Sequence, residues 1–187
     1  MIVLASRSPQ RRAILEQLGV PFEVVEPSAT EAMKGEPGSL VLSNALAKAR
    51  SVEGDVVLGV DTEVVLEGEV FGKPPDLGAA RAMLLRLSGR THEVMSGIAL
   101  LRGGEEQTAV AVTRVRFRSL SDPDLDWYLP SGEWEGRAGG YAIQGRGAAL
   151  VESIDGDFWN VVGLPVPELL RLAPDLIAPP GDARTRP

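Results

Sequence analysis

The feature that most constrains the fold is the alternation of short apolar runs and helical stripes in the first third of the chain. Strands are predicted where apolar and β-branched residues follow one another, and helices where apolar residues recur every three or four positions. A chain that alternates in this way favours an α/β fold. The predicted order is strand 2–5, helix 11–18, strand 22–25, helix 39–51 and strand 55–66.

The second half differs, because two long β-rich stretches follow each other without a helix between them. They cover 93–101 and 108–117, flank Gly103 and Gly104, and are predicted to pair antiparallel. The sheet is therefore expected to be mixed. The other predictions are a hairpin turn at 67–69, a helix with Ala80, Met83, Leu84 and Leu87 on its inner face, a helix over 122–129, a strand over 148–154 and a helix over 166–172.

Length and composition predict one compact domain. A chain of 187 residues with 44% hydrophobic residues can bury one sizeable core. From Ala173 the sequence turns to Pro, Gly, Asp and Arg, a composition that cannot bury enough apolar surface to order itself. We therefore expect a domain over 1–172 and a disordered tail over 173–187.

Composition also excludes several classes of protein. The absence of cysteine rules out disulfides, thiolate zinc sites and a cysteine nucleophile, and a single histidine argues against a transition-metal site. A formal net charge of −7 argues against stable nucleic-acid binding, which needs a basic face. No signal-like run and no apolar stretch of membrane-spanning length is apparent. We expect a cytoplasmic protein that binds neither nucleic acid nor membrane.

The first segment that can carry chemistry lies at residues 6–12, where a strand end meets a helix start. Ser8 can cap the helix and Pro9 suits its first turn, so free backbone N–H groups and the positive end of the helix dipole face one way. Arg11 or Arg12 could add a bidentate grip on phosphate oxygens. The alternative is an ordinary helix cap followed by two solvated arginines.

The second segment places Asp61 within a strongly apolar strand. A charge there is costly unless it is paired, protonated or bound to a metal. Asp61 is thus the best candidate for a reacting carboxylate, either as a ligand of a magnesium-like ion or as the base that activates water. A strand-end aspartate that only caps nearby backbone is the alternative. Glu31, in the loop before the second helix, offers a second carboxylate that the sequence alone cannot place near Asp61.

Three further side chains are ambiguous. Lys73 follows a glycine as in a phosphate-binding loop, but the rest of that signature is absent, so Lys73 would act only as an isolated cation. Lys48 is a lone cation on a helix, and the single histidine, His92, is interpreted as structural. The third segment, 137–147, holds four glycines and is interpreted as a binding loop or a flexible hairpin, in which Gln144 could hydrogen-bond to the edge of a base.

Three parts of the chain are most informative when they are taken together: LASRSPQRRAIL, GVDTEVVLEGEVFGKP with LSGRTHEV, and AGGYAIQGRGAALVESIDGDFWNVVGLP. In order and spacing, they closely resemble the motifs of the Maf family of nucleotide pyrophosphatases. The resemblance covers roughly residues 2 to 172. It implies a three-layer α/β fold related to inosine-triphosphate pyrophosphatases, with two lobes around a central cleft, often as a homodimer. It also implies hydrolysis of a nucleoside triphosphate to the monophosphate and pyrophosphate with a divalent metal, Mg²⁺ or Mn²⁺.

The resemblance implies roles for individual residues. Asp61 matches the proposed catalytic base, and Ser8 and Arg11 fall where phosphates are bound. Glu31, Lys48 and Lys73 match the family's loop glutamate, helix lysine and Gly-Lys-Pro lysine. We expect the metal to bridge phosphate oxygens and Glu31 or Asp61.

Three positions separate the substrate classes of the family. Enzymes for dTTP and UTP typically carry Arg, Thr and Gln where this chain has Gln10, Thr62 and Gln144, so two of the three positions favour pyrimidines. The departure at Gln10 leaves the preference open. Arg137 stands where lysine is usual in the family, which keeps the charge but alters the reach of the side chain and should not abolish phosphate binding. The alternatives are a preference for 7-methyl-GTP, a broad nucleotide preference, or a non-catalytic nucleotide-binding regulator of cell division.

Overall fold

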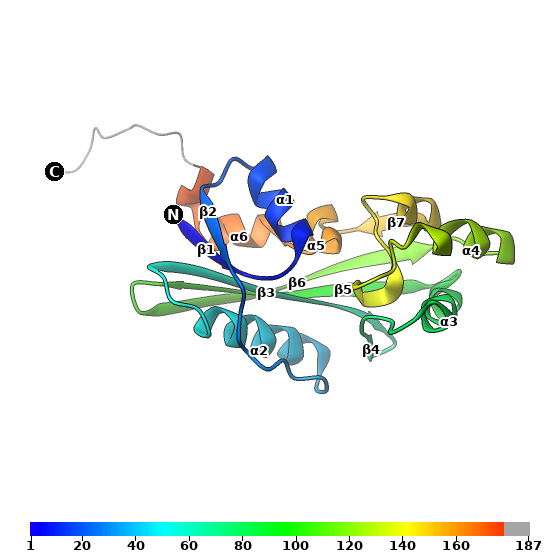
Figure 1. Cartoon of the computed structure of the whole chain (residues 1–187), viewed down its shortest axis with the longest axis horizontal. Helices are drawn as coiled ribbons and strands as arrows, with labels where there is room; N and C mark the ends of the chain where they lie inside the picture. The colour runs from blue at the N-terminus through cyan, green and yellow to red at the C-terminus, as the bar shows by residue number, and fades with distance from the viewer. Residues whose placement is uncertain (178–187) are drawn as a thin grey trace.

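The computed structural model describes residues 1–177 and shows a mixed sheet with helices on both faces (Figure 1). The strands are β1 Ile2–Ala5, β2 Phe22–Val25, β3 Val56–Leu66, β4 Glu69–Phe71, β5 Thr91–Arg102, β6 Glu105–Phe117 and β7 Val151–Asp155. The α-helices are α1 Pro9–Gln17, α2 Pro37–Arg50, α3 Leu77–Leu87, α4 Asp122–Tyr128, α5 Phe158–Val162 and α6 Val166–Leu172. Short 3₁₀ helices are Leu129–Ser131, Ala138–Gly140, Arg146–Leu150 and Pro174–Ile177.

The strand order β2-β1-β3-β5-β6-β7 confirms that the sheet is mixed. β1 pairs in parallel with β2 and β3, whereas β3, β5, β6 and β7 follow one another antiparallel. β4 extends the predicted hairpin after β3, where Glu67 and Gly68 adopt the positive φ angles that tight hairpin turns require. The expected α/β class with a mixed sheet is therefore confirmed.

Two faces of the sheet are covered by different helices. α2 lies on one face, and α1, α5 and α6 lie on the other, so that helix, sheet and helix form three layers (Figure 1). The apolar core is divided along the sheet. One cluster gathers β1, α1 and α6, and another lies at the end occupied by α3 and α4. The candidate site lies where these two parts meet.

Two glycines explain how closely α2 approaches the sheet. A Cβ atom on Gly59 would lie 2.2 Å from the carbonyl oxygen of Ala45, and one on Gly97 would lie 2.2 Å from that of Val41. Real side chains cannot be accommodated at such distances, so only glycine lets the helix backbone rest on β3 and β5. This contact brings polar side chains of α2 next to the middle of β3.

Three local predictions need correction. Residues 148–150, expected at the start of a strand, belong to the 3₁₀ helix Arg146–Leu150 that precedes β7. The short helix α5 was not predicted, although Asp157 caps it by accepting from Trp159 N at 2.9 Å and Asn160 N at 3.1 Å. The tail predicted from Ala173 begins too early, because Ala173 is fully buried and Pro174–Ile177 is helical. The rest of that prediction, 178–187, lies outside the described residues.

Among residues 1–177, no helix is long and apolar enough to cross a membrane.

Candidate active site

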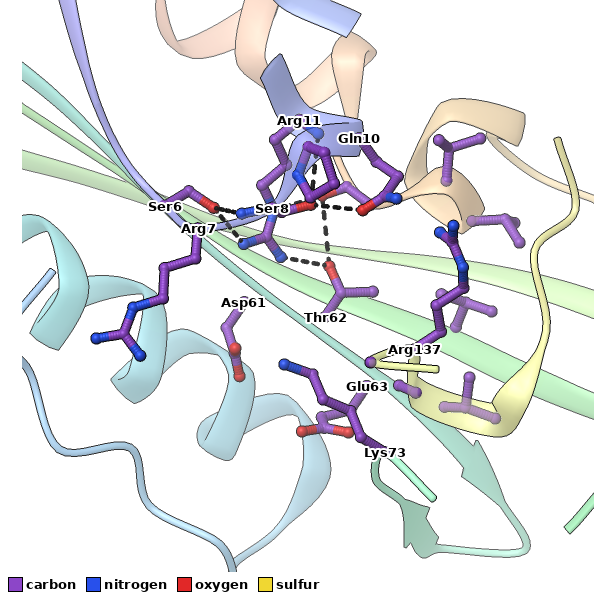
Figure 2. A pocket seen from close by; sticks show the side chains of 18 of the residues that line it. Ser6, Arg7, Ser8, Gln10, Arg11, Asp61, Thr62, Glu63, Lys73 and Arg137 are labelled. Atoms are coloured by element: carbon purple, nitrogen blue, oxygen red, sulfur yellow. Dashed lines mark hydrogen bonds between the residues drawn. The ribbon is translucent and has the colours of Figure 1, made fainter. Parts of the chain in front are cut away.

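A cavity of about 310 Å³ opens between the start of α1, the middle of β3 and the glycine-containing segment after α4. Figure 2 shows that its polar side chains converge from elements distant in sequence. The functional groups that line it are Ser6, Arg7, Ser8, Gln10, Arg11, Glu31, Lys48, Asp61, Thr62, Glu63, Lys73, Arg137 and Gln144. Every predicted site residue except Arg12 is among them.

Asp61 lies at the bottom of the cavity, 4% exposed, on the face of β3 that α2 covers. Its Oδ1 accepts a hydrogen bond from Lys48 Nζ at 2.6 Å, and its Oδ2 accepts one from Asn44 Nδ2 at 3.1 Å. A buried carboxylate needs such partners, because transfer of a charge out of water is costly. Asp61 is thus held as a paired carboxylate facing the cavity.

Lys48 joins the two carboxylates that the sequence could not bring together. Its Nζ lies 2.6 Å from Asp61 and 3.1 Å from Glu31 Oε2. Asn44 fixes the loop that carries Glu31, since its side-chain amide donates to Ala32 O at 3.0 Å and accepts from Ala32 N at 2.8 Å. Asn44 was not predicted as a site residue, although it stands four residues before Lys48 and hence on the same helix face.

Glu63 is a third carboxylate at the cavity, and it was not predicted as a site residue either. It stands two residues after Asp61 in β3, and side chains two residues apart in a strand lie on the same face. This spacing could have predicted that Glu63 lies beside Asp61. Its Oε2 is buried without a hydrogen-bond partner. Burial and then the charge of Asp61 raise the pKa of Glu63 to about 7, against the opposing effect of Lys73 and Lys48.

Arg11 reaches the cavity from the opposite face of β3. Its Nε donates to Gly163 O at 2.8 Å, and its two terminal nitrogens donate to Ser6 Oγ and Thr62 Oγ1, each at 3.1 Å. Burial lowers the pKa of Arg11, with Asp61 and Glu31 acting in the opposite sense. A guanidinium carries five N–H donors, so two remain for a ligand.

The start of α1 also points its polar groups at the cavity. Ser8 caps this helix, with its Oγ accepting from Arg11 N at 3.5 Å, and Pro9 occupies the first turn as predicted. Free N–H groups at a helix start bind anions, so this wall suits a phosphate. The cavity lining holds five cationic and three acidic side chains, a local formal charge of +2 on a chain of −7.

Comparisons with known proteins agree with this geometry. The family model described as "Maf-like protein" matches residues 1–176. This chain belongs to the Maf-like family.

Relatives of this Maf-like protein carry one recurring name. A protein of Symbiobacterium thermophilum named dTTP/UTP pyrophosphatase is 50% identical over 88% of each chain. A protein of the same name from Anaeromyxobacter dehalogenans is 48% identical over 91% of each chain. Another, from Pyrococcus furiosus, is 42% identical over 91% of this chain and 93% of the relative. The solved structure of the Staphylococcus aureus Ham1 protein shows a limited likeness, with a TM-score of 0.46 at 15% identity over 62% of this chain and 71% of that one.

One predicted residue of the Maf-like site lies away from the cavity. Arg12 is exposed and does not line the cavity, whereas its neighbour Arg11 is buried there. Successive residues of an α-helix point about 100° apart, so only one of two adjacent arginines can face the sheet. Gln144, by contrast, lies at the cavity with an exposed side chain, and Thr62 and Gln10 line it too.

The side chains of the Maf-like site suit a hard divalent cation in part. Within residues 1–177, no three Asp, Glu or His side chains converge as a ready-made metal site. Mg²⁺ is nevertheless usually held by one or two carboxylates together with substrate phosphates. Glu31 and Asp61 provide such a pair beside Lys48, and the unpartnered oxygen of Glu63 offers a further oxygen ligand.

Proposed function

We propose that this Maf-like protein is a dTTP/UTP pyrophosphatase, which hydrolyses these nucleotides to the monophosphate and pyrophosphate. The observation that carries the proposal is the buried, paired Asp61 at the bottom of a cavity whose walls are rich in cations. Such a cavity attracts a polyanion and presents a carboxylate to it. Relatives that share the whole domain are named for the same reaction.

Phosphate binding is assigned to the residues that face the cavity from both sides of β3. The free N–H groups at the start of α1, next to Ser8, and the two remaining donors of Arg11 would hold phosphate oxygens from one side. Lys48 and Lys73 would neutralise charge from the other side. The displacement is governed largely by such positioning and charge neutralisation.

Asp61 would orient a water molecule and accept its proton as the water oxygen attacks the α-phosphorus. The bond between the α-phosphorus and the α,β-bridging oxygen then breaks, and that oxygen leaves with pyrophosphate. Lys48 and Asn44 each hold one oxygen of Asp61, so the carboxylate cannot rotate away from the cavity. A divalent metal, Mg²⁺ or Mn²⁺, held by Glu31 or Asp61 with phosphate oxygens, would neutralise charge that develops in the transition state.

The preference for pyrimidines rests on Gln144 and Thr62. Gln144 is exposed at the cavity and can both donate to and accept from the edge of a base. Thr62 has its hydroxyl engaged by Arg11 at 3.1 Å and by Ser96 Oγ at 2.8 Å, so it would act by placing Arg11 and by its small size. The proposed setting is the cytoplasm, with the chain as a homodimer.

The test is pyrophosphate release by the purified protein from dTTP, UTP, CTP, purine triphosphates and 7-methyl-GTP, with Mg²⁺, Mn²⁺ or no metal. We expect turnover of dTTP and UTP that falls about 10³-fold or more in Asp61→Asn, because the base is lost while the fold is kept. Wild-type-like turnover by a folded Asp61→Asn would contradict the role of Asp61.

The same panel separates the alternatives. Turnover confined to 7-methyl-GTP, or spread evenly over all nucleotides, would keep the chemistry and overturn the pyrimidine assignment. Tight binding of nucleotides without turnover under every metal condition would instead support a non-catalytic regulator.

A further inference from the structure

Arg137, the first residue of the glycine-containing segment 137–147 that follows α4, extends into the cavity opposite the wall formed by α2 (Figure 2). Its Nε donates to Glu133 O at 2.6 Å, which fixes the stem of the guanidinium. Its terminal nitrogens lie 2.8 and 3.2 Å from the side-chain amide of Gln10. Arginine has no acceptor, so the oxygen of that amide must face Arg137.

With its oxygen towards Arg137, the amide of Gln10 turns its nitrogen towards the start of α1. That nitrogen then donates to Ser8 Oγ at 3.0 Å. Gln10 therefore bridges the helix cap at the phosphate-binding wall and the guanidinium from the far side of the cavity. Both of its functional atoms are engaged by protein groups.

Glu133 connects Arg137 to the residue proposed to read the base. While its carbonyl holds Arg137, its carboxylate accepts from Arg146 N at 2.9 Å and Gly147 N at 3.2 Å. These N–H groups belong to residues two and three positions after Gln144. One residue thus sets the positions of both Arg137 and the loop that carries Gln144.

We propose that Arg137 binds the phosphates of the substrate from the wall opposite α2, and that Gln10 is a positioning residue that holds Arg137 there without touching the nucleotide. The inference deepens the proposed function and rests on it. After its bonds to Glu133 and Gln10, the guanidinium retains two N–H donors, enough for a bidentate contact with phosphate oxygens. Gln10 then affects the affinity for the nucleotide only through Arg137, and it does not discriminate between bases.

The alternative role for Gln10 is a direct contact with the base, and a double-mutant cycle separates the two. The four proteins are the wild type, Gln10→Ala, Arg137→Met and the double variant, each measured with dTTP, UTP and GTP. Gln17→Ala, an exposed glutamine at the other end of α1, is the matched control.

Arg137→Met is expected to raise KM about 10-fold or more for every nucleotide, because one charge-assisted contact is lost, with kcat changed less than about 3-fold. Gln10→Ala is expected to raise KM about 5-fold in the wild type and to add nothing in Arg137→Met, since two residues that act as a unit are non-additive. Arg137→Lys, which keeps the charge but not the planar fork, should give an intermediate KM.

Additive effects of the two substitutions, or a change in the ratio of dTTP to GTP turnover in Gln10→Ala, would overturn the proposal in favour of a direct base contact. The dissociation constant of α,β-methylene-dTTP, measured by titration calorimetry on the same proteins, gives an answer that does not depend on turnover. If the wild type binds this analogue but hydrolyses nothing, the proposed function fails while the cycle still decides the role of Arg137. If Arg137→Met and Arg137→Lys both bind the analogue like the wild type, the proposal fails by itself.

Discussion

The two faces of β3 differ in how fully their polar groups are hydrogen-bonded. On the face covered by α1, Thr62 shares its hydroxyl with Arg11 and Ser96, and Arg11 makes three hydrogen bonds to protein atoms. On the face covered by α2, Glu63 keeps an oxygen without any partner beside the ion pair of Asp61 and Lys48.

The difference indicates which face is built for stability and which for chemistry. Polar groups that satisfy one another hold the start of α1 on the sheet, whereas crowded carboxylates raise the free energy of the folded protein and are tolerated where function requires them. Loss of Arg11 on the α1 face should therefore lower stability with a smaller effect on turnover. On the α2 face, loss of the cation that pairs with Asp61 should lower turnover strongly as well as stability, whereas loss of the uncompensated charge of Glu63 should raise stability. Each prediction below tests this division.

The largest effect is expected for Lys48→Met. Turnover should fall about 10³-fold because Asp61 loses the cation that holds it, and the free energy of unfolding should fall by about 3 kcal/mol because an uncompensated charge stays buried. Steady-state kinetics and urea unfolding measure the two losses. Lys34→Met, an exposed lysine in the preceding loop, is the control.

The double variant Lys48→Met/Asp61→Asn sharpens the comparison. Neutralising Asp61 removes the buried charge, so most of the lost stability should return while turnover stays at background. If stability is not regained, the loss in Lys48→Met comes from packing of the lysine stem, and the electrostatic account of this face is wrong.

A smaller effect, on the other face, is expected for Arg11→Gln. Loss of hydrogen bonds from a charged group that ties α1 to β3 and to Gly163 should cost about 2 to 3 kcal/mol of unfolding free energy. Turnover should fall less than in Lys48→Met, through KM. Arg12→Gln should change neither quantity, and an equal loss in this exposed neighbour would contradict the assignment of Arg11 to the cavity.

The smallest effect is expected for Glu63→Gln, and it depends on pH. Because the pKa of Glu63 is raised in the folded protein to about 7, the folded state binds this proton more tightly than the unfolded state does. This tighter proton binding contributes fully to the free energy of unfolding below about pH 4.5, and the contribution is lost as the pH rises through 7.

Glu63→Gln should therefore match the wild type near pH 4.5 and exceed its unfolding free energy by about 1 to 2 kcal/mol at pH 8, a value reduced from the full shift for partial solvation. Thermal or urea unfolding at both pH values checks this, with the exposed Glu53→Gln as control. Equal unfolding free energies of the two proteins at pH 8 would show that the charge of Glu63 does not destabilise the folded protein.

The sequence by itself determined the order and type of most elements, because the period of apolar residues reports local geometry. It also marked Asp61, since a charge in an apolar strand is conspicuous, and Ser8, since a serine before proline at a helix start suits a cap. Residue-by-residue matching to family motifs placed Glu31, Lys48 and Lys73 at the same site.

Only the tertiary structure decided which side chains meet. Glu31 reaches Asp61 through Lys48 because Gly59 and Gly97 let α2 lie on the sheet, and Arg137 meets Gln10 across the cavity. The choice between Arg11 and Arg12 likewise depends on how α1 is rotated against β3. These contacts join segments far apart in the chain, and their pairing is set by packing of complementary surfaces, which no local period encodes.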